Sequence, residues 1–225
     1  MPPPMSRVCE TLDMSTPNQN RQGNATRMRL VKTAEKLFAA QGVDAVSIRA
    51  VNSAAGLGPA SVHYHFGSKD DLLAAVLLDL GGAVRDQIRI NVDRLAASPV
   101  PPTADDLVRA VTEPYLELVL RQRVRGMRWV KIIAQISQEG HPALEAAGQQ
   151  VNESLLDQVR RAYPHSDPDR LPLRWAISVM GFLQALGRAD EWSHGAGRLS
   201  PEDLTSFYED LVVFVVGGAD RLLGS

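Results

Sequence analysis

A short segment near the amino terminus carries side chains that could recognise the edges of nucleic-acid bases. Residues 59–66 read PASVHYHF. On a helix, the small, hydroxyl-bearing and aromatic residues of this segment would project outward: Ala60, Ser61, His63 and Tyr64. A serine hydroxyl donates to or accepts from base edges, and an alanine or tyrosine side chain contacts the methyl group of thymine. These residue types therefore suit a helix that lies in the major groove of DNA.

Two short helices joined by a tight turn are expected to position this segment. Ser47 is suited to cap a first helix over 48–54, and Pro59 suits the first turn of a second helix over 59–65. Between them, Gly56 supplies a backbone angle that lets the second helix cross the first. The apolar residues can close a small core with the preceding helix: Leu37, Phe38, Ile48, Val51, Leu57, Val62 and Phe66. This arrangement is a helix-turn-helix.

The rest of the chain is expected to be helical, because no stretch shows the alternation of a β-strand. A helix is expected from about Ala25 to Gln41, with Asn24 as its N-cap. A long helix is expected from Lys69 to about Ala96, with a candidate bend at Gly81-Gly82. Further helices are expected near residues 104–121, 126–138, 142–163, 172–192 and 201–223. The sequence thus predicts an all-α fold, with an N-terminal three-helix helix-turn-helix domain followed by a C-terminal helical bundle.

Composition excludes several classes of protein. The 225 residues are 44% hydrophobic and 22% charged, which is enough to bury a sizeable core. The longest apolar run, Leu211–Ala219, spans nine residues, whereas a membrane-spanning helix needs about 20. The single cysteine, Cys9, excludes an internal disulfide framework and a zinc site built from cysteines.

Charge is distributed unevenly along the chain. The net charge is −2, but residues 1–69 carry eight Lys and Arg against four Asp and Glu, whereas the other 156 residues carry 16 against 22. A basic amino-terminal part on an acidic body is consistent with a local contact to a polyanion. A chance imbalance would give the same pattern.

The sequence shows no catalytic or metal-binding pattern. It contains none of the motifs GxGxxG, GKS, GKT, HExxH and GxSxG. His63 and His65 lie two residues apart, and residues with this spacing do not share a helix face. We therefore expect no metal site, no cofactor and no catalytic residue, which favours a binding protein over an enzyme.

One continuous segment combines several short motifs in a fixed order. In KTAEKLFAAQGVDAVSIRAVNSAAGLGPASVHYHFGSKDDLL, an LF-x-x-x-G helix end is followed by an S-I helix start, an AG turn, a Y-x-HF-like end and an SK-D-x-LL entry to the next helix. Through these motifs, residues 24–84 resemble the DNA-binding domain of TetR-family transcriptional regulators.

The resemblance implies roles for individual residues. Positions that contact phosphate or reach into the groove correspond to Ser47 and Arg49. Base-facing positions of the recognition helix correspond to Pro59, Ala60, Ser61 and Tyr64. Further contacts to the DNA backbone correspond to His63, His65 and Lys69. Lys69 lies at a helix N-terminus, which repels a cation but attracts a phosphate, so a bound phosphate would account for the lysine.

Three residues depart from the family pattern. Asn52 replaces a small apolar residue that is usually buried, and a buried amide needs hydrogen-bond partners. Gly58 replaces a Ser-like cap. His63 replaces a tyrosine, and a histidine there would make DNA affinity depend on pH near neutrality.

The resemblance also implies an organisation and a function for the whole chain. It implies a DNA-binding domain over 24–84 with its helix-turn-helix at 47–66, and a helical ligand-binding and dimerisation domain over 85–225. Residues 1–23 show no apolar period and lack the apolar core of a signal peptide, so we expect them to form a disordered tail. The protein would be a cytoplasmic, nucleoid-associated repressor. It would bind a palindromic double-stranded DNA operator as a homodimer and respond to a small-molecule effector. The alternatives are a regulator without a small-molecule ligand and, as a different class, a helical enzyme.

Apolar residues of the C-terminal part are candidates for ligand and subunit contacts. The candidate ligand contacts are Trp129, Ile133, Trp175, Met180 and Phe182. The candidate dimer contacts are Leu183, Leu186, Leu211, Phe214 and Val215. Packing within the core of one chain is the alternative explanation for both sets. It is favoured for the first set, whereas a two-fold operator, which needs two recognition helices, favours the subunit contact for the second.

A run of basic residues in the C-terminal part is open to two interpretations. It comprises Arg121, Arg123, Arg125, Arg128 and Lys131. The run is either a solvated helix end that faces the amino-terminal domain or a contact for an anionic ligand such as a phosphate-bearing acyl carrier.

Overall fold

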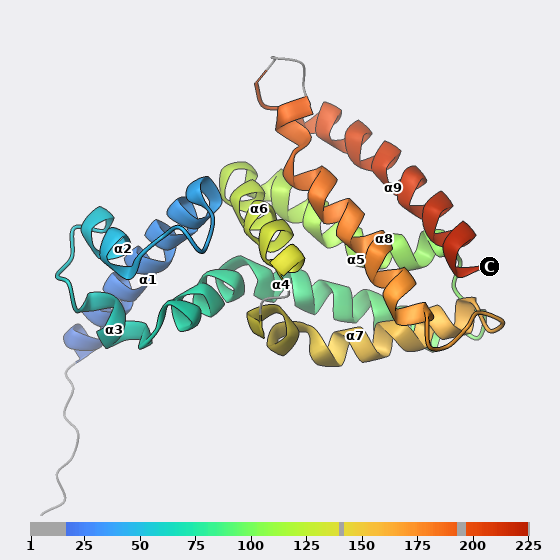
Figure 1. Ribbon diagram of the computed structural model, residues 1–225, viewed down its shortest axis with the longest axis horizontal. Helices are drawn as coiled ribbons and strands as arrows, with labels where there is room; N and C mark the ends of the chain where they lie inside the picture. The colour runs from blue at the N-terminus through green and yellow to red at the C-terminus, as the bar shows by residue number, and fades with distance from the viewer. Residues whose placement is uncertain (1–16, 140–141, 193–196, 225) are drawn as a thin grey trace, which may run out of the picture.

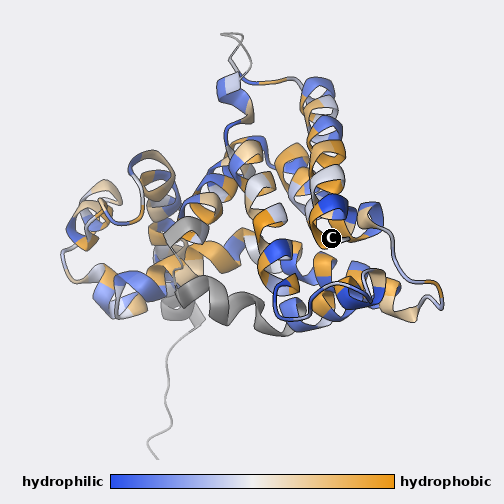
Figure 2. Ribbon diagram, turned by 45° about the vertical axis from the view of Figure 1, so that its right-hand side comes forward, coloured by the Kyte–Doolittle hydropathy of each residue, from blue (hydrophilic) through white to orange (hydrophobic). Residues whose placement is uncertain are grey.

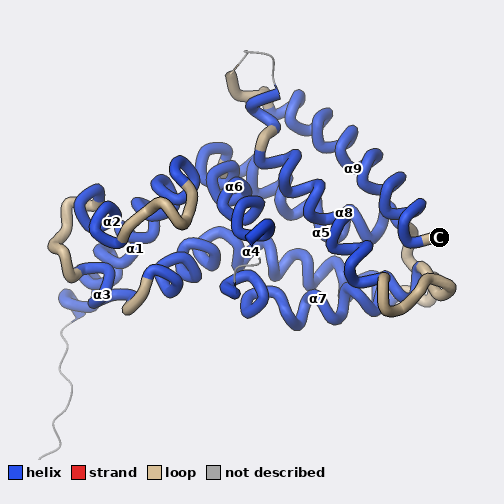
Figure 3. Tube along the Cα trace, viewed as in Figure 1, coloured by secondary structure: helices blue, strands red, loops and turns tan. Residues whose placement is uncertain are grey.

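The protein is built from helices alone over the residues that the structure describes. The computed structural model describes residues 17–139, 142–192 and 197–224, and none of these residues forms a strand (Figure 3). The elements are α1 (Pro17–Gln41), α2 (Ile48–Ala54), α3 (Ser61–Phe66), α4 (Lys69–Ala97), α5 (Ala104–Arg121), α6 (Arg123–Glu139), α7 (Pro142–Ala162), α8 (Leu171–Gly187), the short 3₁₀ helix η1 (Ala189–Trp192) and α9 (Pro201–Leu223). The expected all-α fold is confirmed.

The helices form a small amino-terminal unit and a larger body. The unit consists of α1, α2 and α3, and α4 runs from it into the body (Figure 1). In the body, α5 packs against α4, α6 and α9, α8 packs against α6 and α9, and α7 lies along α4. Helix α6 also packs against α1, so the unit touches the body at a second place. No helix among the described residues is long and apolar enough to cross a membrane.

The first helix begins earlier than the sequence suggested. We expected a disordered tail up to residue 23 and a helix from about Ala25, but α1 begins at Pro17. A proline is tolerated in the first turn of a helix, and Arg21, Gln22 and Asn24 are polar and exposed. An exposed polar helix carries no apolar period, so hydrophobic periodicity does not reveal it. Residues 1–16 of the expected tail lie outside the described residues.

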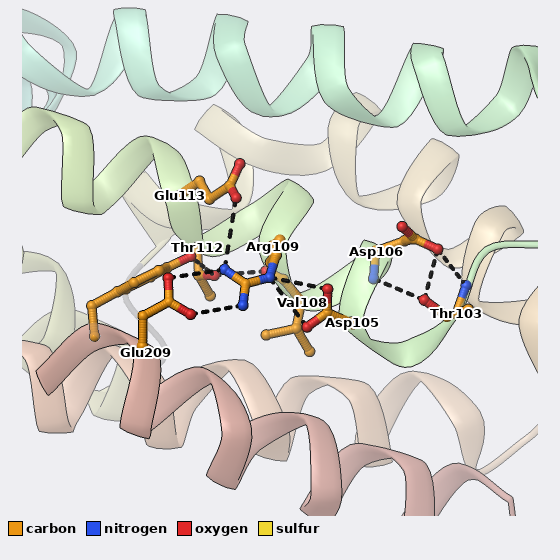
Figure 4. Close-up of polar contacts among 9 residues, drawn as sticks. Thr103, Asp105, Asp106, Val108, Arg109, Thr112, Glu113 and Glu209 are labelled. Atoms are coloured by element: carbon orange, nitrogen blue, oxygen red, sulfur yellow. Dashed lines mark hydrogen bonds and ion pairs between the residues drawn. The ribbon is translucent and has the colours of Figure 1, made fainter. Parts of the chain in front are cut away.

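Several helix starts are set by side-chain caps. Ser47, Ser68 and Ser200 each accept a hydrogen bond from a backbone N–H in the first turn of α2, α4 and α9. At the start of α5, Thr103 Oγ1 accepts from the Asp106 amide at 3.2 Å, and Asp106 Oδ2 accepts from the Thr103 amide at 2.8 Å (Figure 4). This reciprocal capping box satisfies two amides that the helix cannot pair itself. The hydrogen bonds from Thr103 lower the pKa of Asp106.

An arginine joins α5 to α9 at the surface of the body. Arg109 Nη1 and Nη2 donate to the two carboxylate oxygens of Glu209 at 3.1 and 2.8 Å, and Arg109 Nε donates to Asp105 (Figure 4). The hydrogen bond from Arg109 lowers the pKa of the Glu209 carboxyl. The buried Thr112 and Tyr208 hydroxyls, also from α5 and α9, lie 3.0 Å apart. These polar contacts fix the register of two helices that otherwise meet through apolar side chains.

A chain of aromatic rings crosses the core of the body. Tyr115 contacts Trp129 with ring centroids 5.8 Å apart and Phe182 at 6.1 Å, and Phe182 contacts Tyr208 at 6.1 Å. Burial raises the pKa of the Tyr115 hydroxyl to about 12. Hydrophobic and hydrophilic segments alternate along the helices that surround these rings, as expected for helices that bury one face (Figure 2).

Helix α6 presses closely on α4 at one glycine. The Trp129 indole Nε1 donates to the carbonyl oxygen of Leu77 at 3.0 Å. The same ring lies so close to Gly81 that a Cβ atom there would overlap it. Helix α4 is continuous through Gly81 and Gly82 but changes direction as it passes α6 (Figure 1). Gly81 therefore provides the space in which Trp129 joins the two helices.

This contact predicts opposite effects at two adjacent glycines. Gly81→Ala should lower the free energy of unfolding by about 1–3 kcal/mol, because the added methyl group overpacks the Trp129 ring. Gly82→Ala should raise it by up to about 1 kcal/mol, because alanine favours a helix more than glycine. At Gly82 a Cβ atom meets only Leu78 Cδ1 at an ordinary 3.7 Å. Urea denaturation of both variants checks this, and equal effects at the two positions would contradict it.

Candidate nucleic-acid interface

The turn between α2 and α3 has the geometry of a helix-turn-helix. Helix α2 begins after Ser47, whose side chain accepts a hydrogen bond from the Ala50 amide at 3.1 Å. Gly56 adopts a φ of 62°, a left-handed conformation that is strained for other residues. Helix α3 begins at Ser61, slightly later than the expected Pro59. The sequence-predicted order of helix, glycine turn and helix is therefore present.

A buried asparagine fastens α3 to α2. Asn52 is 2% exposed. Its Nδ2 donates to the Pro59 carbonyl at 2.6 Å, and its Oδ1 accepts from the Val62 amide at 3.1 Å. Asn52, which departs from the family pattern, thus has the hydrogen-bond partners that a buried amide needs. It pairs an amide and a carbonyl at the start of α3 that the short helix leaves unpaired.

The predicted base-facing residues lie on the outer side of α3 and the turn before it. Tyr64 is 85% exposed, whereas Val62 is fully buried and closes the small core of the unit. Among the other residues assigned to DNA, some are exposed: Ser47, Arg49, Pro59, Ala60 and His63. Three are half-buried: Ser61, His65 and Lys69. The structure brings all nine residues to the amino-terminal unit and the first turn of α4.

Two of these residues also hold neighbouring loops. His63 Nδ1 lies 2.7 Å from the carbonyl oxygen of Gly67, next to the end of α3. Lys69 Nζ donates to the Asp44 carbonyl at 3.2 Å and so reaches from α4 to the loop before α2. An ammonium group has three donors, so Lys69 retains the capacity to bind a phosphate while it holds this loop.

Two arginines of α1 also lie on this surface. The sequence alone did not assign them a role there. The guanidinium of Arg27 lies over the Phe66 ring, 4.8 Å from its centroid. Arg29 Nη2 lies beside Gly56, 3.1 Å from the position of a Cβ atom there. Both arginines are exposed, so they add positive charge next to α3. Their spacing places both arginines outside the apolar face of α1. The packing of α1 against the turn between α2 and α3 brings them next to α3.

The candidate ligand contacts divide into interior and surface residues. Trp129, Ile133, Trp175 and Phe182 are buried in the body, at most 6% exposed. Met180 is 38% exposed and so lies at the surface of the chain. It lies on α8 three residues after the exposed Ile177 and so shares the outer face of that helix.

Most of the candidate dimer contacts lie inside the protomer. Leu183, Leu186, Leu211 and Val215 are at most 9% exposed and pack in the core of the chain, so their assignment to a subunit contact stays a prediction. Phe214 is 74% exposed. The exposed apolar residues of these two helices, which we call the α8–α9 apolar face, are Leu173, Ile177, Met180, Val213 and Phe214. Helical period identified the apolar positions but not which of them meet a partner from the same chain.

The described residues offer no group of three His, Cys, Asp or Glu side chains that could hold a metal ion. His63 and His65 both lie on α3, and His63 is engaged with Gly67. What the surface around α3 presents is a projecting aromatic ring, small side chains and several cationic groups. Chemically, such a surface can bind a polyanion and contact base edges.

Comparison with known proteins agrees with this geometry. Residues 30–76 match the family model described as bacterial regulatory proteins, tetR family, and residues 109–218 match the model described as tetracyclin repressor-like, C-terminal domain. The chain is 29% identical over 157 residues to the HTH-type transcriptional regulator BetI of Rhizobium meliloti, covering 69% of this chain and 74% of that protein.

Two solved structures share the fold. The ketosteroid transcriptional regulator KstR2 of Mycobacterium tuberculosis superposes with a TM-score of 0.55 at 19% identity, covering 87% of this chain and 95% of that one. The TetR-family regulator SCO4454 of Streptomyces coelicolor gives 0.52 at 25% identity, covering 90% and 97%.

The position of Asn52 predicts a local loss of stability when its amide is removed. Asn52→Ala should lower the free energy of unfolding by about 1–3 kcal/mol, because it leaves the Val62 amide and the Pro59 carbonyl without their partner. Hydrogen exchange should also accelerate at the Val62 amide. Ser53→Ala, at an exposed neighbour on α2, is the matched control and should change neither quantity. Equal exchange at Val62 in both variants would refute the role of Asn52.

Proposed function

The chain belongs to the TetR family of transcriptional regulators, and from this premise we propose that it binds a two-fold symmetric operator as a homodimer through α2 and α3. As a member of this family it is a regulator of transcription and not an enzyme. The observation that carries the proposal is the contrast on α3 between Tyr64, 85% exposed, and Val62, fully buried. A recognition helix needs one face held in the core and one face free for the groove.

Affinity and specificity would come from different residues. Arg49, Ser47 and Lys69 flank α3 and would position the unit on phosphates. The residues that face bases would be Pro59, Ala60, Ser61 and Tyr64. Further backbone contacts would come from His63 and His65. Phosphate contacts supply affinity that falls with salt, whereas base contacts supply sequence specificity.

A homodimer would satisfy the geometry of a two-fold operator. Two half-sites one turn of DNA apart require two recognition helices about 34–36 Å apart. The α8–α9 apolar face supports a subunit contact, because five large apolar side chains on two adjacent helices of one body are at least 38% exposed. Exposed apolar residues gathered in this way favour association.

We further propose that the protein is a repressor released by a small molecule that binds in the body. Helices α5, α6, α8 and α9 contribute the aromatic core in which Trp129, Trp175 and Phe182 lie. An effector bound among these helices would favour a state whose recognition helices are wrongly spaced. A coupling of about 1–3 kcal/mol would lower operator affinity roughly 5–150-fold.

Fluorescence anisotropy with DNA from upstream of the gene tests the assignment of the interface. Tyr64→Ala should weaken operator binding by roughly tenfold or more, the size of a lost base contact. Arg49→Ala should weaken binding to all sequences and reduce the slope of log affinity against log salt by about 1.

The matched control for this experiment removes an arginine far from α3. Arg160→Ala, on the exposed side of α7, should leave both affinity and salt slope unchanged. A folded dimer that binds no two-fold site at low salt would overturn the proposed function.

The α8–α9 apolar face predicts where a charge breaks the dimer. Phe214→Glu should shift the protein to monomers in sedimentation analysis, because the carboxylate would be desolvated in the subunit contact. Val100→Glu is the matched control, since Val100 is 67% exposed but lies in the loop between α4 and α5. If Phe214→Glu remains dimeric, the subunits meet elsewhere.

A further inference from the structure

The basic residues around the start of α6 are paired with carboxylates. Each cation of the run has an acidic partner: Arg121 with Glu117, Arg123 with Asp190, Arg125 with Glu35 and Asp79, Arg128 with Glu35, and Lys131 with Glu191. The interpretation as a helix end that faces the amino-terminal domain described the contacts of Arg125 and Arg128 with Glu35, but not the other pairs. Arg121 and Glu117 both lie on α5, whereas the other partners lie on α1, α4 and η1. The run therefore joins α6 to three neighbouring elements.

The most buried partner is Glu35, on the amino-terminal unit. Its side chain is 3% exposed. Arg125 Nε and Nη2 donate to Glu35 Oε2 at 2.8 and 2.6 Å, and Arg128 Nη1 lies 3.6 Å from Oε1. Removing a charge from water is costly unless its partners have good geometry. Glu35 is therefore stable in its place only while α6 supplies these arginines.

The same arginine reaches a third helix. Arg125 Nη2 also donates to Asp79 Oδ2 of α4 at 2.5 Å. One turn along α6, Trp129 binds the Leu77 carbonyl and packs on Gly81. Asp79 lies between these two positions in sequence. Arg125 thus bridges α1 and α4 two residues before Gly81, where Trp129 packs on α4.

We propose that Arg125 is a positioning residue that sets the angle between the amino-terminal unit and the body. Along the chain, α4 alone leads from the unit into the body, and a single helical connection leaves the unit able to swing. The contact of Arg125 with Glu35 and Asp79 adds a second, directional attachment. In a dimer this angle determines the separation of the two α3 helices, and hence the operator spacing that the protein accepts. This consequence for spacing rests on the proposed function.

A distance measurement tests the positioning role without DNA. Spin labels at Ala54 on α2 and Val100 in the body, both exposed, are introduced in a Cys9→Ser background. Labelled protein is mixed with excess unlabelled protein, so that each particle carries one labelled chain. Arg125→Met should broaden or shift the distance distribution by double electron–electron resonance. Arg121→Met, which removes a 76% exposed arginine with a partner on its own helix, should not.

A second variant separates positioning from folding. Arg125→Met alone leaves the buried Glu35 with only the longer contact to Arg128. The double variant Glu35→Gln/Arg125→Met removes the charges of both residues and should recover much of the thermal stability. It should still show the altered distances, because the directional attachment is absent. A wild-type distribution in the folded double variant would overturn the proposal.

Operator spacing gives the functional readout. Inserting one central base pair moves the half-sites about 3.4 Å further apart and turns one against the other, so the wild type should bind the altered operator at least roughly tenfold more weakly. In the Arg125 variants, the ratio of the dissociation constant for the altered operator to that for the original operator should fall to about threefold or less. The Arg125 variants could instead lose the same factor of affinity for both operators and show the same spin-label distances as Arg121→Met. In that case Arg125 only stabilises the fold, and the proposal fails. If the wild type binds no two-fold site, the proposed function fails, while the distances still decide the role of Arg125.

Discussion

The structure depends on how a six-residue helix is held in place. Helix α3 comprises Ser61–Phe66, and isolated helices shorter than about 12–15 residues are marginal in water. Its shape must therefore come from tertiary contacts. Val62 anchors it in the core, Asn52 pairs groups at its start, and Phe66 lies under the Arg27 guanidinium. Only with one side fixed in this way can Tyr64 project at a defined angle.

The same logic extends from the recognition helix to the whole molecule. Helix α3 is fixed to α2, the amino-terminal unit is fixed to α6 through Glu35, and α6 is fixed to α4 through Trp129 and to η1 through Lys131. Each link uses a polar group with a defined partner and not apolar contact alone. Directional hydrogen bonds and ion pairs thus connect the body to α3 through these elements, and a change in the packing of the body would be transmitted to α3 through them.

The sequence predicted those features that arise from local chemistry. Helical segments, the Ser47 cap and the glycine turn depend on residues a few positions apart, and the structure has them. Features that depend on distant residues were missed. Glu35 and Arg125 are 90 positions apart, and their spacing carries no signal.

Periodicity also did not separate the buried from the exposed members of the candidate subunit and ligand contacts. Periodicity identified the apolar positions of α8 and α9 but could not separate Leu183 and Leu186, which pack inside, from Met180 and Phe214, which are exposed. On an amphipathic helix with a wide apolar stripe, one part of the stripe packs in the core of the chain and another part remains exposed. Only the arrangement of the other helices decides which residues meet the core and which remain outside.

An ion pair at the junction is better explained by geometry than by stability. Replacing a buried ion pair with apolar residues of similar volume is often neutral or stabilising, so a leucine and a methionine could hold α1 to α6 equally firmly. Apolar contact is non-directional, however, and tolerates small rotations. An arginine that donates from Nε and Nη2 to one carboxylate, and from Nη2 to a second, fixes both direction and distance. A protein whose two recognition helices must match a fixed separation on DNA gains from such a contact at the point where its reading unit joins the body.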